Sequence, residues 1–142
     1  MSDYQSLSHT KWDCKYHVVF IPKYRRKVLY GKVRRALGPV LHELARQRES
    51  EILEGRLVQD HVHMMIRIPP KHSVSAVVGY IKGKSAIRMA RDFMGRHQNY
   101  RGYHFWARGF FVSTVGLDED VIRKYIRDQE ENDQKRDQKK LF

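Results

Sequence analysis

The sequence predicts an α+β fold of the ferredoxin-like type. Such a fold has a four-stranded antiparallel sheet, with helices on one face and the other face free for nucleic acid or an active site. Residues 12–21 and 61–68 alternate apolar and polar side chains, as strands do when one face is buried. Residues 31–49 and 73–93 instead repeat apolar residues at helical spacing. The order is strand–helix–strand–strand–helix–strand and then a final helix. This is the split βαβ motif, in which the first and third strands lie side by side at the centre.

The first half of the chain contains three of the expected strands. Residues 1–11 are polar and predict a loose N-terminal arm. Pro22 ends the first strand, and Pro39 lies inside the first helical pattern. We expect a kink or a restart at Pro39, because proline removes a hydrogen bond from a helix. Residues 51–58 form the second strand, and the short connection at 59–60 joins it to the third strand as a hairpin.

The second half of the chain contains a long helix, a strand and a final helix. Ser73 is expected to cap the long helix, because its hydroxyl can accept a hydrogen bond from the first turn. Residues 105–114 are rich in aromatic and β-branched side chains and predict the fourth strand, which Gly116 ends. The acids at 118–120 suit the positive end of the final helix. Residues 131–142 are expected to be a polar C-terminal tail.

Length and composition predict one globular domain over residues 1–142 with a nucleic-acid partner. The chain has 28 Lys and Arg against 16 Asp and Glu, and its formal charge of +12 favours a polyanionic partner over a merely solvated basic surface. No segment approaches the roughly 18 apolar residues of a membrane span, so we expect no membrane partner. The N-terminus does not have the features of a signal peptide. The single cysteine, Cys14, excludes an internal disulfide and fits a cytoplasmic protein.

Two histidines on the third strand are candidate metal ligands. His61 and His63 alternate with Val62, so both point away from the core side of that strand. Neutral imidazole binds manganese, zinc and similar ions, and two imidazoles on one face can hold a single ion. A pair of this spacing also arises by chance in a chain with eight histidines. The alternative is two partly exposed histidines on a basic sheet face.

Tyr125 and Gln129 are candidate active-site residues on the final helix. They lie four residues apart and therefore share a face of the helix. A tyrosine can attack a phosphodiester and hold the cut strand as a phosphotyrosine. A divalent ion on His61, His63 and the side-chain oxygen of Gln129 could polarise that phosphate. The covalent link would conserve the phosphodiester energy, so rejoining would need no ATP. A tyrosine packed in the core is the alternative.

Five blocks of the sequence resemble the single-tyrosine HUH transposases of the smallest bacterial insertion sequences. The blocks are HTKWDCKYHVVFIPKYRR (9–26), DHVHMM (60–65), GYIKGKS (79–85), FWARGFFVSTVG (105–116) and YIRDQ (125–129). They occur in the order of the family and together cover roughly residues 8–135. The five blocks are specific in combination, although any one of them alone is weak.

The resemblance implies a DNA transposase made of a single HUH domain. The metal-binding histidines of the family match His61 and His63, its nucleophile matches Tyr125, and its further metal contact matches Gln129. Such enzymes require Mg²⁺ or Mn²⁺. They cut single-stranded DNA with hairpin ends through a 5′-phosphotyrosine and then rejoin it. They act as homodimers in which the tyrosine helix can complete the partner's active site, in the bacterial cytoplasm in association with the nucleoid.

Several residues are candidates for DNA contacts, because cationic and hydroxyl side chains bind phosphates. They are Lys23, Arg25, Arg26, Lys82, Lys84, Ser85 and Arg108. Arg108 could instead form a surface salt bridge. Three alternatives remain for the function. One is another HUH nuclease, such as a replication initiator or a domesticated repeat-associated relative. The others are a catalytically silent nucleic-acid-binding module and a metal-dependent hydrolase without a covalent step.

Overall fold

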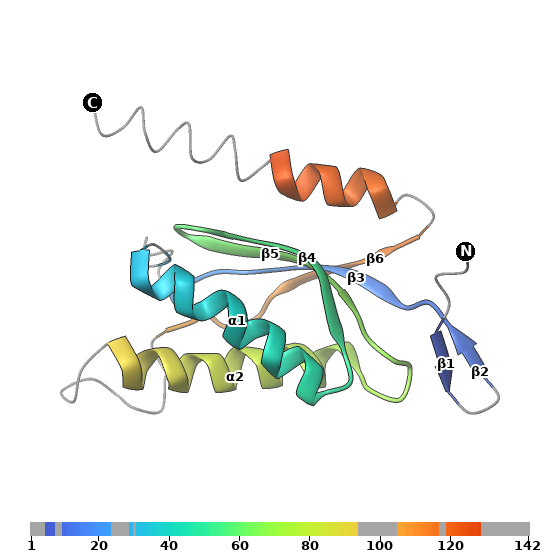
Figure 1. The fold of residues 1–142 in the computed structure, drawn as a ribbon, viewed down its shortest axis with the longest axis horizontal. Coiled ribbons are helices and arrows are strands. Elements are labelled where there is room, and N and C mark those ends of the chain that lie inside the picture. Colours follow the sequence, from blue (N-terminus) through green and yellow to red (C-terminus); the bar gives the residue numbers. More distant parts are fainter. Residues whose placement is uncertain are drawn as a thin grey trace.

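The fold is built around a four-stranded antiparallel sheet in the described part of the chain (Figure 1). The computed structural model describes residues 5–7, 10–23, 29, 31–93, 105–116 and 119–128. The strands, in their order across the sheet, are β4 (Glu51–Val58), β5 (His61–Arg67), β3 (Lys15–Phe20) and β6 (Phe111–Val115). The helices between them are α1 (Gly31–Gln47) and α2 (Val74–Phe93). The predicted α+β fold class and the central position of β3 and β5 are therefore confirmed.

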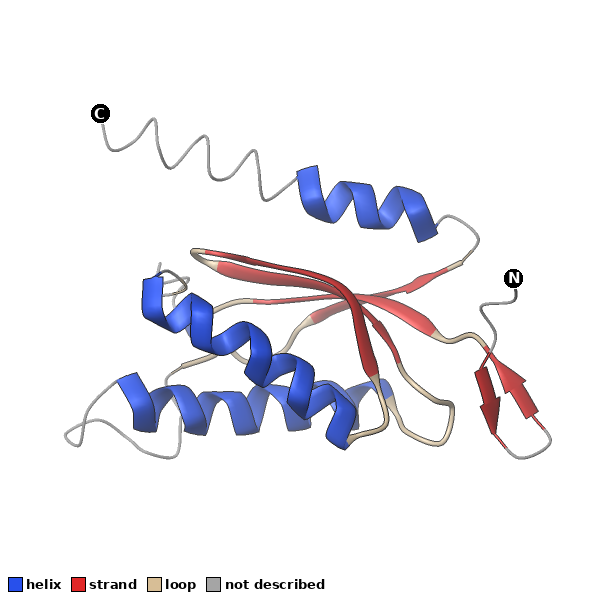
Figure 2. Cartoon of the chain, in the orientation of Figure 1, coloured by secondary structure: helices blue, strands red, loops and turns tan. Residues whose placement is uncertain are grey.

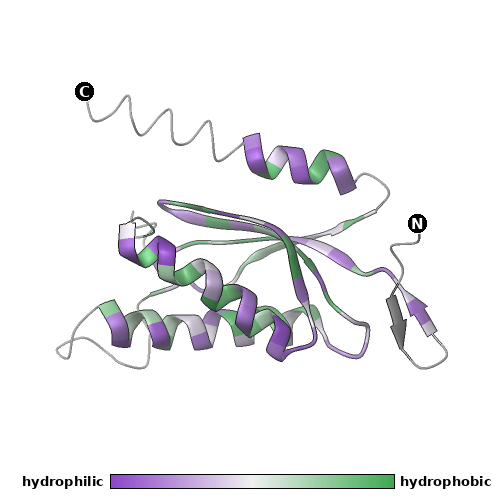
Figure 3. Ribbon diagram, viewed as in Figure 1, coloured by the Kyte–Doolittle hydropathy of each residue, from purple (hydrophilic) through white to green (hydrophobic). Residues whose placement is uncertain are grey.

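The two faces of the sheet are covered by different helices (Figure 2). α1 and α2 lie on one face, and the helix of residues 119–128 lies across the other. The sequence left this second face free for nucleic acid or an active site, and in the structure the helix that carries Tyr125 lies over it. Figure 3 shows that the helix of residues 119–128 is mostly hydrophilic with few hydrophobic positions. It therefore docks on the sheet through few apolar contacts.

The main hydrophobic core lies between the sheet and the pair α1 and α2. The core side chains of β5 are Val62, Met64 and Ile66, and each is at most 1% exposed. They pack in one cluster with Leu37 of α1 and Ile81 of α2. Each such side chain stabilises the fold by about 1.5–3 kcal/mol when it is fully buried. This face of β5 is therefore held firmly, and the direction of its other face follows from it.

Local signals in the sequence are confirmed at two element boundaries. The Ser73 hydroxyl oxygen accepts a hydrogen bond from the Ala76 backbone N–H at 3.1 Å, which caps α2. β4 and β5 form the expected hairpin, with Val58 opposite His61 and two turn residues between them. None of the helices in the described chain is long and apolar enough to cross a membrane.

The N-terminal segment contains more order than its composition predicts. β1 (Gln5–Leu7) and β2 (Thr10–Trp12) pair as a small antiparallel ladder with Gln5 opposite Trp12. This stretch is therefore a hairpin and not the loose arm expected for residues 1–11. Polar composition did not reveal it, because strand pairing depends on backbone groups that every residue carries. The expected polar tail at 131–142 lies outside the described residues.

The fourth strand begins later than predicted, at Phe111 and not at 105. The Lys82 ammonium of α2 donates hydrogen bonds to the carbonyls of Ala107 and Gly109, at 2.8 Å and 2.5 Å. These carbonyls therefore face a side chain and not a neighbouring strand. Gly109 also has a φ of 76°, in the left-handed region that glycine tolerates and a strand does not use. The start of the predicted strand still pairs, since Trp106 bridges Pro22 and the Ala107 N–H donates to the Ile21 carbonyl at 2.9 Å. The contact with Lys82 therefore interrupts the predicted strand only after residue 107.

α1 runs without interruption through Pro39, where the sequence predicted a kink or a restart. Part of the usual clash is missing, because the preceding residue is Gly38, which has no Cβ to meet the proline ring. The proline itself is exposed. The helix therefore tolerates Pro39 at the cost of one backbone hydrogen bond to the Arg35 carbonyl.

Replacing Pro39 with alanine is expected to raise the free energy of unfolding by about 2 kcal/mol. Proline is about 3 kcal/mol less favourable than alanine in a helix interior. Without the proline the unfolded chain has more conformational entropy, which lowers the gain in stability by up to about 1 kcal/mol. Urea unfolding at neutral pH, followed by circular dichroism, measures the change. An unchanged or lower midpoint would show that Pro39 contributes to stability in a way that its exposed position does not account for.

Candidate active site

His61 and His63 lie on the sheet face that the helix of residues 119–128 covers. The period of two in β5 directs their side chains away from the main core. Both are buried, with 8% and 7% of their surface exposed. The alternative of two partly exposed histidines on an open basic face is therefore wrong. Burying an imidazole away from water is unfavourable unless a partner or a ligand compensates it, so this burial needs an explanation.

Asp60 orients the ring of His61. Its carboxylate oxygen Oδ1 lies 2.7 Å from Nδ1 of His61. A carboxylate can only accept, so Nδ1 carries the proton and Nε2 carries the lone pair. A carboxylate behind a histidine is the arrangement that typically orients metal-binding imidazoles. The turn that starts β5 therefore prepares His61 as a ligand.

His63 is neutral and lies against the rings of two other histidines. Burial, followed by the nearby His61 and His17, lowers its pKa to about 4. Its ring centroid lies 4.5 Å from that of His61 and 5.7 Å from that of His17. Its Nδ1 is buried and has no hydrogen-bond partner among the described residues. Neutral imidazole is the form that binds a metal ion, so His63 suits that role, and the contact with Asp60 orients His61 for it.

His17 is a third buried histidine at this site, and it was not among the residues predicted for it. It lies on β3 opposite Met65, and its exposed fraction is 8%. Its ring stacks on His63 and meets the edge of the Tyr125 ring, with centroids 6.2 Å apart. Its Nε2 has no hydrogen-bond partner in the described chain, which is unusual for a buried polar atom. The alternation of residues 12–21 placed His17 opposite the core face, and only the burial shows that it belongs to the site.

Tyr125 is brought to the histidine face by its own helix. Its ring is 48% exposed and lies edge-on to His17. The next residue, Ile126, is completely buried and packs with Met65 and Val115 of the sheet. The structure thus brings Tyr125, His61 and His63 onto one side of the sheet, whereas Gln129 lies outside the described residues. Among the described residues, no three His, Cys, Asp or Glu side chains are grouped to hold a metal ion.

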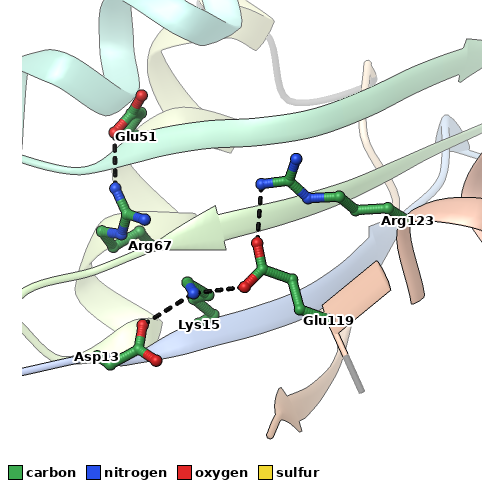
Figure 4. Close-up of polar contacts among 6 residues, drawn as sticks. All are labelled: Asp13, Lys15, Glu51, Arg67, Glu119 and Arg123. Atoms are coloured by element: carbon green, nitrogen blue, oxygen red, sulfur yellow. Dashed lines mark hydrogen bonds and ion pairs between the residues drawn. The ribbon is translucent and has the colours of Figure 1, made fainter. Parts of the chain in front are cut away.

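Ion pairs attach the start of the tyrosine helix to β3 (Figure 4). Lys15 is 4% exposed, and its ammonium lies 2.5 Å from a carboxylate oxygen of Glu119 and 3.0 Å from one of Asp13. Burial acts to lower the pKa of Lys15, but the hydrogen bonds to Glu119 and Asp13 raise it overall. Arg123 pairs with the same Glu119 from one turn later at 2.8 Å. This network and the contacts of Ile126 position the helix that carries Tyr125.

The fold itself uses two of the residues predicted to contact DNA. Ser85 is completely buried. Its hydroxyl accepts a hydrogen bond from Trp106 Nε1 at 2.9 Å and donates one to the Lys82 carbonyl at 3.2 Å. The Lys82 ammonium holds the 107–109 carbonyls, and burial lowers its pKa. We therefore do not carry these two residues into a DNA-binding role.

The remaining candidates for DNA contacts are less constrained. Lys84 and Arg108 are exposed, and Lys23 is partly buried. The ammonium of Lys84 lies 6.0 Å from the centre of the Tyr80 ring. Arg25 and Arg26 lie outside the described residues. Lys23, Lys84 and Arg108 therefore keep their predicted role as a hypothesis.

Comparisons of the sequence identify relatives that are transposases. The family model described as "Transposase IS200 like" matches residues 10–129. The transposase for insertion sequence element IS200 from Salmonella typhimurium is 47% identical over 133 residues, which cover 94% of this chain and 88% of that protein. The ISDra2 transposase TnpA from Deinococcus radiodurans is 28% identical over 123 residues, which cover 86% of this chain and 88% of that protein.

Two solved structures share the fold. A Deinococcus radiodurans protein described as a transposase has a TM-score of 0.71 and 28% identity, and the match covers 88% of this chain and 97% of that chain. The structure of a REP-associated tyrosine transposase bound to a REP hairpin has a TM-score of 0.57 and 17% identity. That match covers 89% of this chain and 68% of the other chain. The fold and these likenesses define a DNA-processing enzyme of the transposase class. The chain belongs to the IS200-like transposase family.

Replacing His17 with phenylalanine is expected to raise the free energy of unfolding by about 1 kcal/mol. Phenylalanine keeps a ring against His63 and Tyr125 and removes a buried nitrogen whose missing hydrogen bond costs about 1–3 kcal/mol. Chemical denaturation measures the change. His42 is an exposed histidine of α1, and its replacement by phenylalanine is the control, with an expected effect within about 0.5 kcal/mol. Destabilisation by His17→Phe alone would indicate that the nitrogen has a partner.

Without metal, the protein is expected to lose stability as the pH falls from about 6.5 to about 4. The pKa of His63 is about 4 in the folded protein and 6.5 in the reference state, so the unfolded chain binds the proton more readily in this window. Above about pH 6.5 the contribution of neutral His63 to the free energy of unfolding is constant. By pH 4 about 3 kcal/mol of it is lost. Urea midpoints measured in EDTA across this range test the prediction. The variant His63→Phe should show a shallower slope, and an equal slope would contradict the assignment.

Proposed function

We propose that this transposase cuts and rejoins single-stranded DNA at the ends of an insertion sequence through a 5′-phosphotyrosine on Tyr125. One observation carries the proposal above the others. The Tyr125 ring lies edge-on to His17, which stacks on the buried, neutral His63. A half-exposed phenol beside buried imidazole nitrogens is placed to attack a phosphodiester that a metal ion on those nitrogens would activate.

The proposed reaction is a reversible transesterification. The phenol oxygen of Tyr125 attacks the phosphorus, and the bond from phosphorus to the 3′ oxygen breaks. The phenol loses its proton and the departing 3′ oxygen gains one, so a 5′-phosphotyrosine and a 3′-hydroxyl result. Attack by the 3′-hydroxyl of another DNA end restores a phosphodiester and releases Tyr125. No nucleotide cofactor is needed, because the phosphodiester energy stays in the protein–DNA bond.

His61 and His63 are proposed to bind a divalent ion together with the side-chain oxygen of Gln129. Asp60 leaves the lone pair of His61 on Nε2, and the buried Nδ1 of His63 has no hydrogen-bond partner in the described chain, so this donor set fits a metal ion. Bound Mg²⁺ or Mn²⁺ would polarise the phosphate and lower the cost of the charge that develops on it. His17 supports the ring of His63 from the other side by stacking.

The protein is proposed to act as a homodimer on DNA with hairpin ends. Exposed apolar side chains lie along the edge strand β6 and on the tyrosine helix, at Phe111, Val112 and Val121. Such side chains support an apolar contact with a second copy, whose tyrosine helix could complete the site. Hairpin-bearing ends are the substrate to test first, because a tyrosine transposase of this fold was solved bound to a REP hairpin.

Mixing the protein with labelled single-stranded DNA from the element ends and Mn²⁺ or Mg²⁺ is expected to give a covalent protein–DNA adduct on a denaturing gel. Replacing Tyr125 with phenylalanine removes the attacking oxygen and should abolish the adduct completely. Replacing His61 with alanine should lower its yield by at least about 100-fold, because the phosphate is no longer polarised. A duplex of the same sequence should give no adduct.

The other outcomes identify other functions. Cleavage that survives in Tyr125→Phe would show a hydrolase or a different nucleophile. Tight binding without cleavage in either metal would show a nucleic-acid-binding module that has no covalent chemistry. The variant Tyr80→Phe is a control for the chemical change alone, since Tyr80 lies on α2 and packs against the main core, away from the histidine cluster.

A further inference from the structure

A cavity of about 520 Å³ lies between α1 and β4. β4 is an edge strand, so the cavity lies at one side of the sheet. Ligand pockets in proteins usually have volumes of roughly 300–1,000 Å³. The cavity is therefore large enough for a ligand of the size of a nucleotide, and of its lining residues only His63 has a role in the chemistry proposed above.

Glycines keep this cavity open. Gly31 and Gly38 of α1 and Gly55 of β4 are among the lining residues. The two helical glycines are seven residues apart, which is about two turns, so they share one face of α1. A Cβ on Gly31 would meet nothing within 4 Å, and on Gly38 its nearest neighbour would be a methyl group of Leu57 at 3.8 Å. The surrounding packing thus leaves space that side chains could occupy.

The lining residues combine positive charge with an apolar surface. Arg34 and Arg35 of α1 provide the charge, and Leu41 and Leu57 are among the apolar residues. A guanidinium group binds phosphate through two parallel hydrogen bonds. The face of a base packs on apolar or aromatic surface. None of the residues that line the cavity within the described chain is acidic. The chemistry of the cavity therefore suits a nucleotide with its phosphate.

The cavity reaches the strand of the candidate active site, because His63 of β5 is among its lining residues. Arg56 of β4 is directly opposite His63 of β5, and adjacent strands are about 4.8 Å apart. A DNA strand that passes over the edge of β4 can therefore reach both places. Glu54 lies 3.1 Å from the Arg56 guanidinium and offsets part of its charge. Arg34 and Arg35 line the cavity from α1 and are the contacts expected for a phosphate.

We propose that this cavity is a subsite for one unpaired nucleotide of the DNA strand that the active site cuts. The phosphate lies against Arg34 and Arg35, and the base packs on the apolar surface between α1 and β4. The identity of the ligand rests on the proposed function, whereas the cavity, its charge and its position do not. The subsite would add affinity for the single strand close to the cleavage position.

Binding of a labelled single-stranded element end, measured by fluorescence anisotropy in EDTA at several KCl concentrations, tests the subsite without any cutting. The double variant Arg34→Gln/Arg35→Gln is expected to bind about tenfold more weakly. The slope of log Kd against log salt should fall by about 0.7 for each phosphate that the variant no longer neutralises. Arg46 is exposed on the same helix and does not line the cavity. Arg46→Gln is therefore the matched control, with an expected change below about twofold.

A second variant fills the cavity without changing the charge. The Cβ of Gly55→Val would lie 3.5 Å from Ile52 Cγ2, an ordinary contact, and valine favours strands. In a scan of oligonucleotides with one abasic position each, one position should weaken binding to the parent protein by about tenfold. For the Gly55→Val variant, the oligonucleotide with that abasic position and the intact oligonucleotide should bind with equal affinity, because the filled cavity no longer accepts the base.

The results distinguish the subsite from the cutting reaction. Equal losses for Arg46→Gln and for Arg34→Gln/Arg35→Gln would overturn the subsite, because they would reflect total charge alone. A scan in which no abasic position is coupled to Gly55→Val would overturn it too. Coupling in a protein that forms no covalent adduct would refute the proposed cutting and leave the subsite standing. Adduct formation without coupling would refute the subsite and leave the proposed cutting standing.

Discussion

The two-residue period of β5 is the constraint on which the rest of the structure depends. β5 pairs with β3 on one side and β4 on the other, so its register is set along both edges. A slip by one residue would move His61 and His63 into the core under α1 and α2, and Val62 and Met64 to the opposite face. Each apolar side chain buried on the core face stabilises the correct register by about 1.5–3 kcal/mol. Apolar packing on one face of β5 therefore holds His61 and His63 in place on the other face.

The polar groups on the other face of the sheet fall into two kinds. Lys15 is buried, and its charge is compensated by the carboxylates of Asp13 and Glu119, the second of which belongs to the helix that carries Tyr125. His17 and His63 are equally buried, but each has a ring nitrogen with no hydrogen-bond partner in the described chain. A buried polar atom that serves the fold normally has a partner. Local rules are broken most often at functional sites, and this contrast separates Lys15, which holds the helix, from the histidines of the candidate site.

Positive charge alone does not identify a DNA contact in this protein. Lys82 and Ser85 looked suitable in the sequence, yet both bind the segment that precedes β6. Arg34 and Arg35 of α1 had no motif to mark them, and they line a cavity that the fold leaves open. A cation that the backbone needs for its own carbonyls is not available to a phosphate. The net charge of +12 therefore indicates the class of partner and not the surface that meets it.

The sequence by itself determined the fold class, the faces of β3 and β5, the Ser73 cap and the family, because these follow from periodicity and from short motifs. The tertiary structure alone decided that β6 begins at Phe111, that α1 continues through Pro39, and that His17 joins the histidine pair. Each of these depends on a partner far away in the chain. Lys82 takes the carbonyls at 107–109, and the helix of residues 119–128 buries His17. Local patterns record which way a side chain points, whereas the residue that it meets is set by packing between distant segments.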